Sequence, residues 1–75
     1  MNANELISRR EADVLHLQLN RPDKGNALSG TLVLALTEGI DVAARDASLR
    51  LLVLSGAGRH FCTGFDLSDL DQETD

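Results

Sequence analysis

The chain has 75 residues, of which 12 are acidic, 7 are basic and 43% are apolar, with a formal net charge of −5. This charge disfavours general electrostatic binding to a polyanion, so nucleic acid is not an expected partner. One cysteine cannot form an internal disulfide, and no Cys/His cluster has metal spacing, which predicts a metal-free chain in a reducing compartment. Since neither a leader pattern nor a run of about 18 apolar residues is visible, we expect a cytoplasmic protein with no membrane association.

The first two apolar segments predict a β-hairpin. Leu6 to Arg9 is a short candidate strand, and Val14 to Leu19 has leucines at every second position, which is the period of a strand. Pro22 lacks an N–H and restricts the residue before it, so the second strand is expected to end near Asn20. Asp23 to Asn26 should then form a loop.

A helix followed by a third strand completes the predicted order β, β, α, β. Ser29 is a candidate N-cap, and Leu32, Leu36 and Ile40 recur at helical spacing, which predicts an amphipathic helix of about 15 residues. Leu51 to Leu54 is apolar on both faces, as is typical of a strand in parallel pairing. Because one helix cannot cover both faces of such a strand, the sequence predicts that more chain packs against it.

The last eight residues, from Ser68 to Asp75, contain one apolar and four acidic side chains. We therefore divide the chain into a domain portion, residues 1–70, and an acidic flexible tail, residues 71–75. An acidic tail of this kind is easily cut by proteases. We therefore hypothesise that the chain is the N-terminal piece of a nicked or shortened protein.

The turn around Gly64 is the feature that points most directly to chemistry. Glycine reaches positive φ angles without penalty, so a turn there can leave the N–H of Phe65 unpaired. An unpaired amide can stabilise an oxyanion. On local sequence alone, the alternative is an ordinary tight turn between a strand and a helix. Neither Cys62, expected to be inert packing, nor His60, expected on the loop surface, has a partner that would activate it.

Two motifs at a fixed offset carry a family resemblance. The first is Leu19-Asn20-Arg21-Pro22 with Asn26-Ala27-Leu28-Ser29, and the second is Gly56-x-Gly58 with Phe61-Cys62-x-Gly64-x-Asp66-Leu67. Together they resemble the first third of the crotonase superfamily, the enoyl-CoA hydratases and isomerases, over about residues 6 to 70. The resemblance implies an α/β fold, namely the first ββα units of the crotonase spiral, incomplete in this chain, in an enzyme that forms trimers or hexamers.

The resemblance also implies roles for particular residues. Phe65 would supply its backbone N–H as one of two donors in an oxyanion hole. The residues expected to contact substrate and coenzyme A are Lys24, Ala27, Leu28, Thr63, Gly64, Asp66 and Leu67. Plain structural roles remain open for some of them, because Lys24 is also typical of a solvated loop charge and Asp66 of a helix N-cap. The family's catalytic glutamates would lie beyond residue 75, and neither Glu38 nor Glu73 is a candidate to replace them.

The function that follows is the N-terminal part of an enoyl-CoA hydratase/isomerase-type enzyme that binds acyl-CoA and stabilises a thioester enolate, with 2-enoyl-CoA hydration, a lyase reaction, favoured. A coenzyme A thioester would be the substrate, with no permanently bound cofactor. The partner would be the rest of the same enzyme, without which this piece should be inactive.

Two other functions are compatible with parts of the sequence. The first is a non-catalytic, truncated crotonase-like module that binds acyl-CoA or another protein. The second is dinucleotide binding, suggested by Gly56-x-Gly58, but its fingerprint requires a glycine where Phe61 stands, and no phosphate-binding Gly-Lys-Ser/Thr follows.

Overall fold

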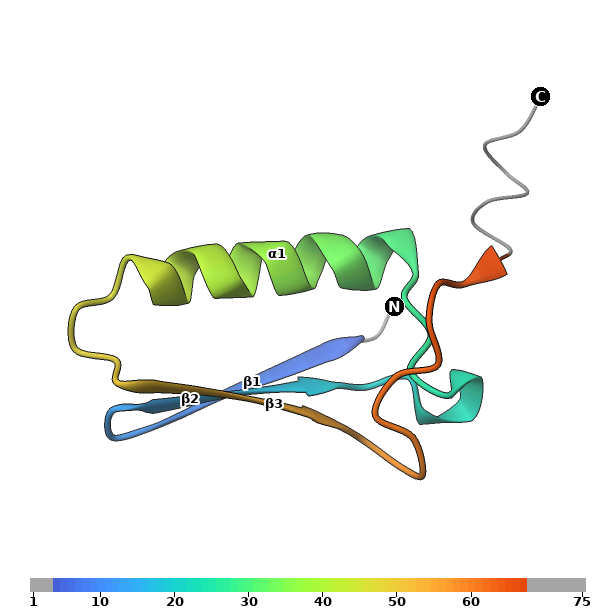
Figure 1. The fold of residues 1–75 in the computed structure, drawn as a ribbon, viewed down its shortest axis with the longest axis horizontal. Coiled ribbons are helices and arrows are strands. Elements are labelled where there is room, and N and C mark those ends of the chain that lie inside the picture. Colours follow the sequence, from blue (N-terminus) through green and yellow to red (C-terminus); the bar gives the residue numbers. More distant parts are fainter. Residues whose placement is uncertain (1–3, 68–75) are drawn as a thin grey trace.

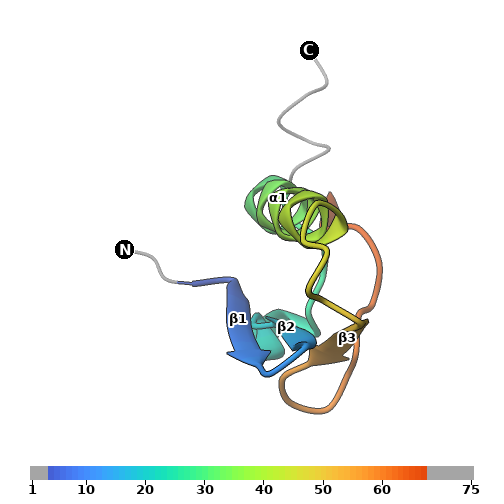
Figure 2. The same cartoon turned by 90° about the vertical axis from the view of Figure 1, so that its left-hand side faces the viewer.

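A computed structural model describes residues 4–67 of the chain, and in it one helix lies over one face of a three-stranded sheet (Figures 1 and 2). The elements in chain order are β1 (Leu6–Glu11), β2 (Val14–Leu19), the short 3₁₀ helix η1 (Pro22–Lys24), α1 (Gly30–Ala44) and β3 (Leu51–Gly56). The predicted order β, β, α, β is therefore confirmed. The predicted tail, residues 71–75, and the expected helical turn after Leu67 lie outside the described residues.

The sheet has the order β1-β2-β3 and mixes both kinds of pairing. β1 and β2 are antiparallel, with Leu6 opposite Leu19, whereas β2 and β3 are parallel, with Leu17 opposite Leu54. The parallel pair was predicted, because two parallel strands need a crossover connection, which α1 supplies here. β2 is consequently the central strand, and the chain leaves the C-terminal ends of β2 and β3 at the same edge of the sheet.

The core is aliphatic and small. Leu17, Leu19 and Leu32 are 1%, 2% and 0% exposed, so two of the period-two leucines of β2 are buried together with the first turn of α1. Ser29 caps the helix, because its Oγ accepts a hydrogen bond from the Leu32 N–H at 3.0 Å. Gly39 lets the helix approach the sheet, since a Cβ atom there would lie 3.3 Å from Leu17 Cδ1.

Three expected boundaries were wrong. β1 continues past Arg9 to Glu11, because its last residues still pair with β2 at the solvent edge. η1 overlaps the loop expected from Asp23 to Asn26, because a 3₁₀ turn begins at Pro22, whose fixed φ suits a first helical position. β3 runs to Gly56, two residues beyond the apolar run from Leu51 to Leu54. The chain then bends back so closely that a Cβ at Gly56 would lie 2.5 Å from the Phe61 carbonyl oxygen.

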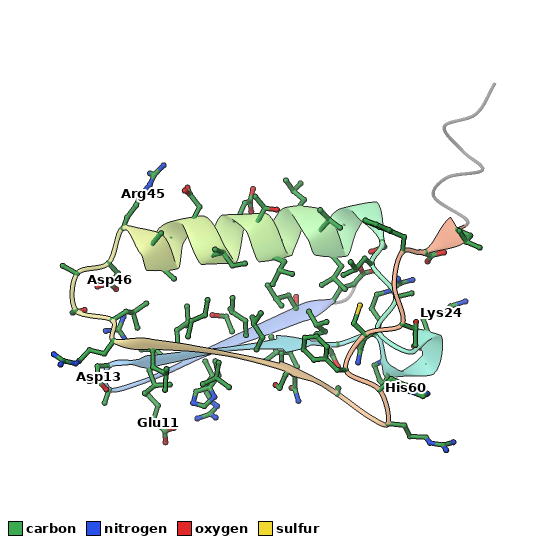
Figure 3. The ribbon with its side chains drawn as sticks, in the orientation of Figure 1. Glu11, Asp13, Lys24, Arg45, Asp46 and His60 are labelled. Atoms are coloured by element: carbon green, nitrogen blue, oxygen red, sulfur yellow. The ribbon has the colours of Figure 1, made fainter. Side chains whose placement is uncertain are left out.

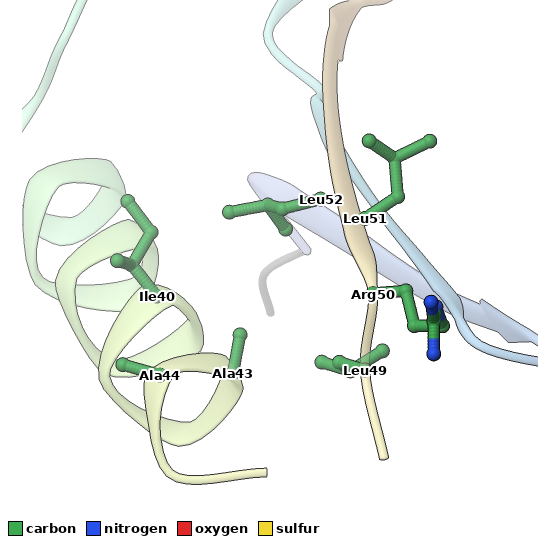
Figure 4. Close-up of a pocket in the computed structure, with 7 residues that line it drawn as sticks. All are labelled: Ile40, Ala43, Ala44, Leu49, Arg50, Leu51 and Leu52. Atoms are coloured by element: carbon green, nitrogen blue, oxygen red, sulfur yellow. The ribbon is translucent and has the colours of Figure 1, made fainter. Parts of the chain in front are cut away.

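Apolar side chains are exposed to solvent along β3 and near the C-terminal end of α1. Leu51, Leu54 and Val42 are 57%, 42% and 66% exposed. A pocket of about 270 Å³ lies between the end of α1 and the start of β3 (Figure 4). The prediction that one helix leaves part of β3 uncovered is confirmed. In the described part of the chain, no helix has the length and apolarity needed to cross a membrane.

Candidate functional site

The two motifs meet through an isolated parallel bridge between Leu28 and Phe65. The Leu28 N–H donates to the Gly64 carbonyl at 2.7 Å, and the Asp66 N–H donates to the Leu28 carbonyl at 2.9 Å. Figure 1 shows the two segments side by side at the end of the sheet where η1 lies. Residues separated by more than half the described chain therefore form one local structure.

The amide of Phe65 is left unpaired by this bridge. In a parallel ladder only every second residue of a strand bonds to a given neighbour, and here the bonding residues are Gly64 and Asp66. Among residues 4–67, the Phe65 N–H has no acceptor. Gly64 has φ of +108°, and no atom lies within 4 Å of where its Cβ would be. The turn therefore presents a backbone donor beside open space.

Asn26 fastens the loop after β3 to the loop after β2. Its side chain is 0% exposed and its φ is +58°, in the left-handed region. The Arg21 N–H donates to Asn26 Oδ1 at 2.7 Å, while Asn26 Nδ2 donates to the carbonyls of Ala57 at 2.9 Å and His60 at 2.7 Å. All three hydrogen bonds are directed to the main chain, so Asn26 sets the backbone path of both loops.

Arg21 extends this network to the bridge itself. One guanidinium nitrogen donates to the carbonyl of Ala27, and another lies 3.1 Å from Asp66 Oδ2. On the same guanidinium, Nε lies 3.8 Å from Glu5 Oε2, and the other Glu5 oxygen accepts a hydrogen bond from Ser29 Oγ at 2.6 Å. The ion pairs thus connect the helix N-cap to both motifs.

The structure brings together most of the predicted contact residues. Ala27 and Leu28 lie beside Gly64 and Asp66 through the contacts above. Thr63 packs against the backbone of Gly25, where an added Cβ would meet Thr63 Cγ2 at 2.9 Å.

Three predicted residues project into solvent. The side chains of Phe65 and Leu67 are 71% and 70% exposed. Lys24 stands apart on the solvent side of η1, at the same end of the molecule as His60 (Figure 3). His60 is exposed, as predicted. Cys62 is half-buried outside any strand, and its Sγ accepts a weak hydrogen bond from the Gly64 N–H at 3.4 Å.

Arg21, Asn26 and Glu5 were not identified as site residues from the sequence. In the sequence, Arg21 is recognisable only as the residue before a proline, and Asn26 only as part of a motif. One usable signal is that Arg21 follows the end of β2, just before a loop whose partner motif contains an acid, Asp66. Their pairing spans 45 residues, and a single sequence does not show which distant charges meet.

The two described pockets lie at other positions. The pocket near β3 and a second one of about 450 Å³, between α1 and the β1-β2 hairpin, include none of the predicted contact residues in their linings. Within residues 4–67, no group of three or more His, Cys, Asp or Glu side chains is arranged to hold a metal ion. The candidate site is therefore a surface formed by two loops, with a backbone amide and apolar side chains exposed on it.

The family model for enoyl-CoA hydratase/isomerase matches residues 9–75. The chain is 41% identical over 64 residues to the human mitochondrial Delta(3,5)-Delta(2,4)-dienoyl-CoA isomerase, covering 85% of this chain and 20% of the relative. It is 39% identical over 70 residues to the Escherichia coli 2,3-dehydroadipyl-CoA hydratase, covering 93% of this chain and 28% of the relative. The chain therefore belongs to the enoyl-CoA hydratase/isomerase family, part of the crotonase superfamily.

The solved structures agree with this assignment. A crystal structure of enoyl-CoA hydratase from Mycobacterium tuberculosis H37Rv superposes with a TM-score of 0.89 at 32% identity, over 95% of this chain and 32% of that one. The expected fold class is confirmed, because the sheet and helix match the N-terminal part of the crotonase fold. The chain spans less than a third of the length of these relatives.

Proposed function

We propose that this chain forms the first part of an acyl-CoA site in which the Phe65 amide stabilises negative charge on a thioester oxygen. The observation that carries the proposal is the Phe65 N–H, which has no acceptor among residues 4–67 and lies in a turn with open space at Gly64. Relatives named for acting on enoyl- and dienoyl-CoA support the substrate class. The reaction we favour is hydration of a 2-enoyl-CoA.

The chemistry of this reaction explains why a fixed amide is useful. When water adds to the double bond of an enoyl thioester, negative charge moves onto the thioester oxygen as an enolate forms. A backbone donor that is already in position lowers the energy of this charge, and one such donor typically contributes about 2.7 to 4 kcal/mol. The second donor and the carboxylates that move protons are proposed to lie in the rest of the enzyme. The 75-residue chain alone is therefore expected to be inactive.

The loop surface suggests how the substrate would be held. The exposed side chains of Phe65 and Leu67 offer apolar contacts, and Lys24 is an exposed cation suited to a phosphate group. Ala27, Leu28 and Thr63 would line the path between them. The coenzyme A thioester is proposed as a substrate, with no permanently bound cofactor. A cytoplasmic trimer or hexamer is the proposed form of the complete enzyme.

A non-catalytic acyl-CoA-binding module is the second candidate. It is favoured by the state of Asp66, the acid next to the Phe65 amide, whose carboxylate is held by Arg21 at 3.1 Å. This carboxylate has a structural partner and is therefore assigned no role in proton transfer. Such a chain would bind a thioester at the same amide without turning it over.

One experiment separates these functions. The complete polypeptide that includes residues 1–75 is incubated with a short 2-enoyl-CoA, and the thioester is then analysed by mass spectrometry. A gain in mass of one water supports hydration. A double bond that has shifted position, detected by proton NMR because the mass is unchanged, supports isomerisation at the same site. Binding by calorimetry without conversion supports the non-catalytic module. A complete polypeptide that neither binds nor converts the 2-enoyl-CoA would overturn the proposal.

A further inference from the structure

We propose that Arg21 is a positioning residue that fixes the Phe65 amide by holding the two segments of the bridge together. The inference rests on the proposed role of Phe65. It adds a residue to the site that contacts neither the thioester nor the reacting atoms. Its role is to set the direction of the Phe65 N–H, which is the group that would bind the thioester oxygen.

The geometry places Arg21 on both sides of the bridge at once. Its guanidinium donates to the carbonyl of Ala27, the residue before Leu28, and pairs at 3.1 Å with Asp66, the residue after Phe65. A planar guanidinium has several donors in a fixed arrangement, so two acceptors bound to it are also fixed relative to each other. One side chain therefore restrains both partners of the Leu28–Phe65 bridge.

Burial makes this ion pair different from Arg10–Asp46, another Arg–Asp pair that links distant parts of the chain. The side chains of Arg21 and Asp66 are 13% and 19% exposed, whereas those of Arg10 and Asp46 are 42% and 33% exposed, at a similar separation of 2.8 Å. Solvent screens exposed pairs strongly, and many of them contribute little. The Arg10–Asp46 pair is therefore a chemical match for Arg21–Asp66 in a position far from the site.

The turn at Gly64 needs such a restraint. Glycine has few steric limits on its backbone, and no atom lies within 4 Å of the Cβ position of Gly64 to pack against it. The Gly64 carbonyl, which shares its peptide plane with the Phe65 N–H, accepts a hydrogen bond from the Leu28 N–H. The Asp66 N–H donates to the Leu28 carbonyl, so this bridge fixes the plane. Without Arg21, which holds Ala27 and Asp66 together, the bridge has room to open, and the peptide plane of Phe65 can then rotate. A rotated amide would no longer point at the thioester oxygen.

The test compares Arg21→Lys and Asp66→Asn with Arg10→Lys and Asp46→Asn in the complete polypeptide. Lysine keeps the charge of Arg21 but cannot bind two acceptors in a fixed plane. We expect Arg21→Lys to lower kcat about 10- to 100-fold with little change in KM, because misplacing a reacting contact by about 1 Å can cost as much as 100-fold. Asp66→Asn, a milder change, should lower kcat less, and the two changes together should lower it by less than the product of their separate effects.

Two results would overturn the inference. The first concerns an unaltered protein that converts 2-enoyl-CoA: if the kcat of Arg21→Lys equals that of Arg10→Lys, Arg21 has no positioning role. The second concerns an unaltered protein that converts nothing. In that case the proposed function has failed, and the position of the Phe65 amide is measured directly. The Phe65 amide signal in an NMR spectrum should then move in Arg21→Lys and stay in place in Arg10→Lys. Equal positions in both variants would show that Arg21 does not set this amide.

Discussion

The two ends of this small structure are completed in different ways. At the loop end, the polar groups find their partners within the described chain. Asn26 is fully buried with three hydrogen bonds to main-chain atoms, and no buried side-chain nitrogen or oxygen among residues 4–67 lacks a partner. Away from the loops, on β3 and the last turn of α1, Leu51, Leu54 and Val42 are 57%, 42% and 66% exposed, and an open pocket lies between the end of α1 and the start of β3. Exposed apolar side chains occur in both regions, but the buried polar side chains of residues 4–67, Asn26 and Ser29, both lie at the loop end.

This difference shows which part of the site the segment can form by itself. A buried polar group without a partner is costly, so the loops need their hydrogen bonds in place wherever the segment folds. Apolar surface can be covered by any well-shaped neighbour, and the chain spans less than a third of its relatives. We expect the loop end to be preformed and the β3 end to depend on further chain.

The largest expected loss of stability comes from removing the Asn26 side chain at the loop end. Asn26→Ala removes the partner of the Arg21 N–H and of the carbonyls of Ala57 and His60. Each unpaired buried group costs about 1 to 3 kcal/mol, so we expect the free energy of unfolding to fall by roughly 3 kcal/mol or more in denaturant titrations. The matched control is Asn20→Ala, whose side chain donates to the Asn4 carbonyl at the surface. Equal losses in the two variants would contradict the role given to Asn26.

The next largest expected loss of stability concerns Leu54, on the exposed part of β3. In the complete polypeptide, Leu54→Ala should lower the free energy of unfolding by about 2 to 5 kcal/mol, because we expect further chain to bury this side chain. If Leu54 stays 42% exposed, as in residues 4–67 alone, the change should be within roughly 0.5 kcal/mol. Denaturant titration distinguishes the two, and the smaller value would remove the contrast between the ends.

A smaller effect concerns the cap that joins the loop end to the helix. Ser29→Ala removes the hydrogen bond from the Leu32 N–H and the contact with Glu5, so we expect a loss of about 1 kcal/mol. Thr37→Ala is the control, because this hydroxyl also bonds to the main chain but is exposed in the middle of α1. A loss for Ser29→Ala no greater than for Thr37→Ala, measured by thermal unfolding, would argue against a capping role.

The smallest effect depends on pH and lies far from the candidate site. Hydrogen bonds from the Ser48 side chain and then from Arg10 lower the pKa of Asp46 from 3.8 to about 2. Because the folded chain favours the carboxylate, its stabilising contribution is present above pH 3.8 and is lost as the pH falls through about 2. Carbon NMR of the Asp46 carboxyl should show this midpoint, and Arg10→Gln should raise it. A midpoint at 3.8 in the unaltered protein would contradict the contacts.

The regular elements could be predicted because local sequence determines them. The leucine period of Val14 to Leu19, the Ser29 cap and the apolar run at Leu51 each depend on residues within a few positions of one another. The boundaries failed where long-range contacts decide. β1 extends to Glu11 through its antiparallel ladder with β2, and β3 extends to Gly56 through its parallel ladder with β2.

The candidate site was predictable only in part. The two motifs indicated that Ala27 and Leu28 belong with the segment from Thr63 to Leu67, and the bridge at Leu28 brings these segments together. The roles of Arg21 and Asn26 depend on contacts across 45 and 34 residues, and no local pattern reveals such contacts. The assignment of substrate and oxyanion roles to individual residues remains a prediction.

Replacing the Phe65 amide with an ester tests the account most directly. Incorporating the hydroxy acid phenyllactate at position 65 of the complete polypeptide exchanges the N–H for an oxygen and keeps the side chain. We predict that kcat/KM for a 2-enoyl-CoA falls by about 100- to 1,000-fold, whereas Phe65→Ala, which keeps the N–H, loses far less. An ester variant as active as the unaltered enzyme would contradict the claim that this amide stabilises the thioester oxygen.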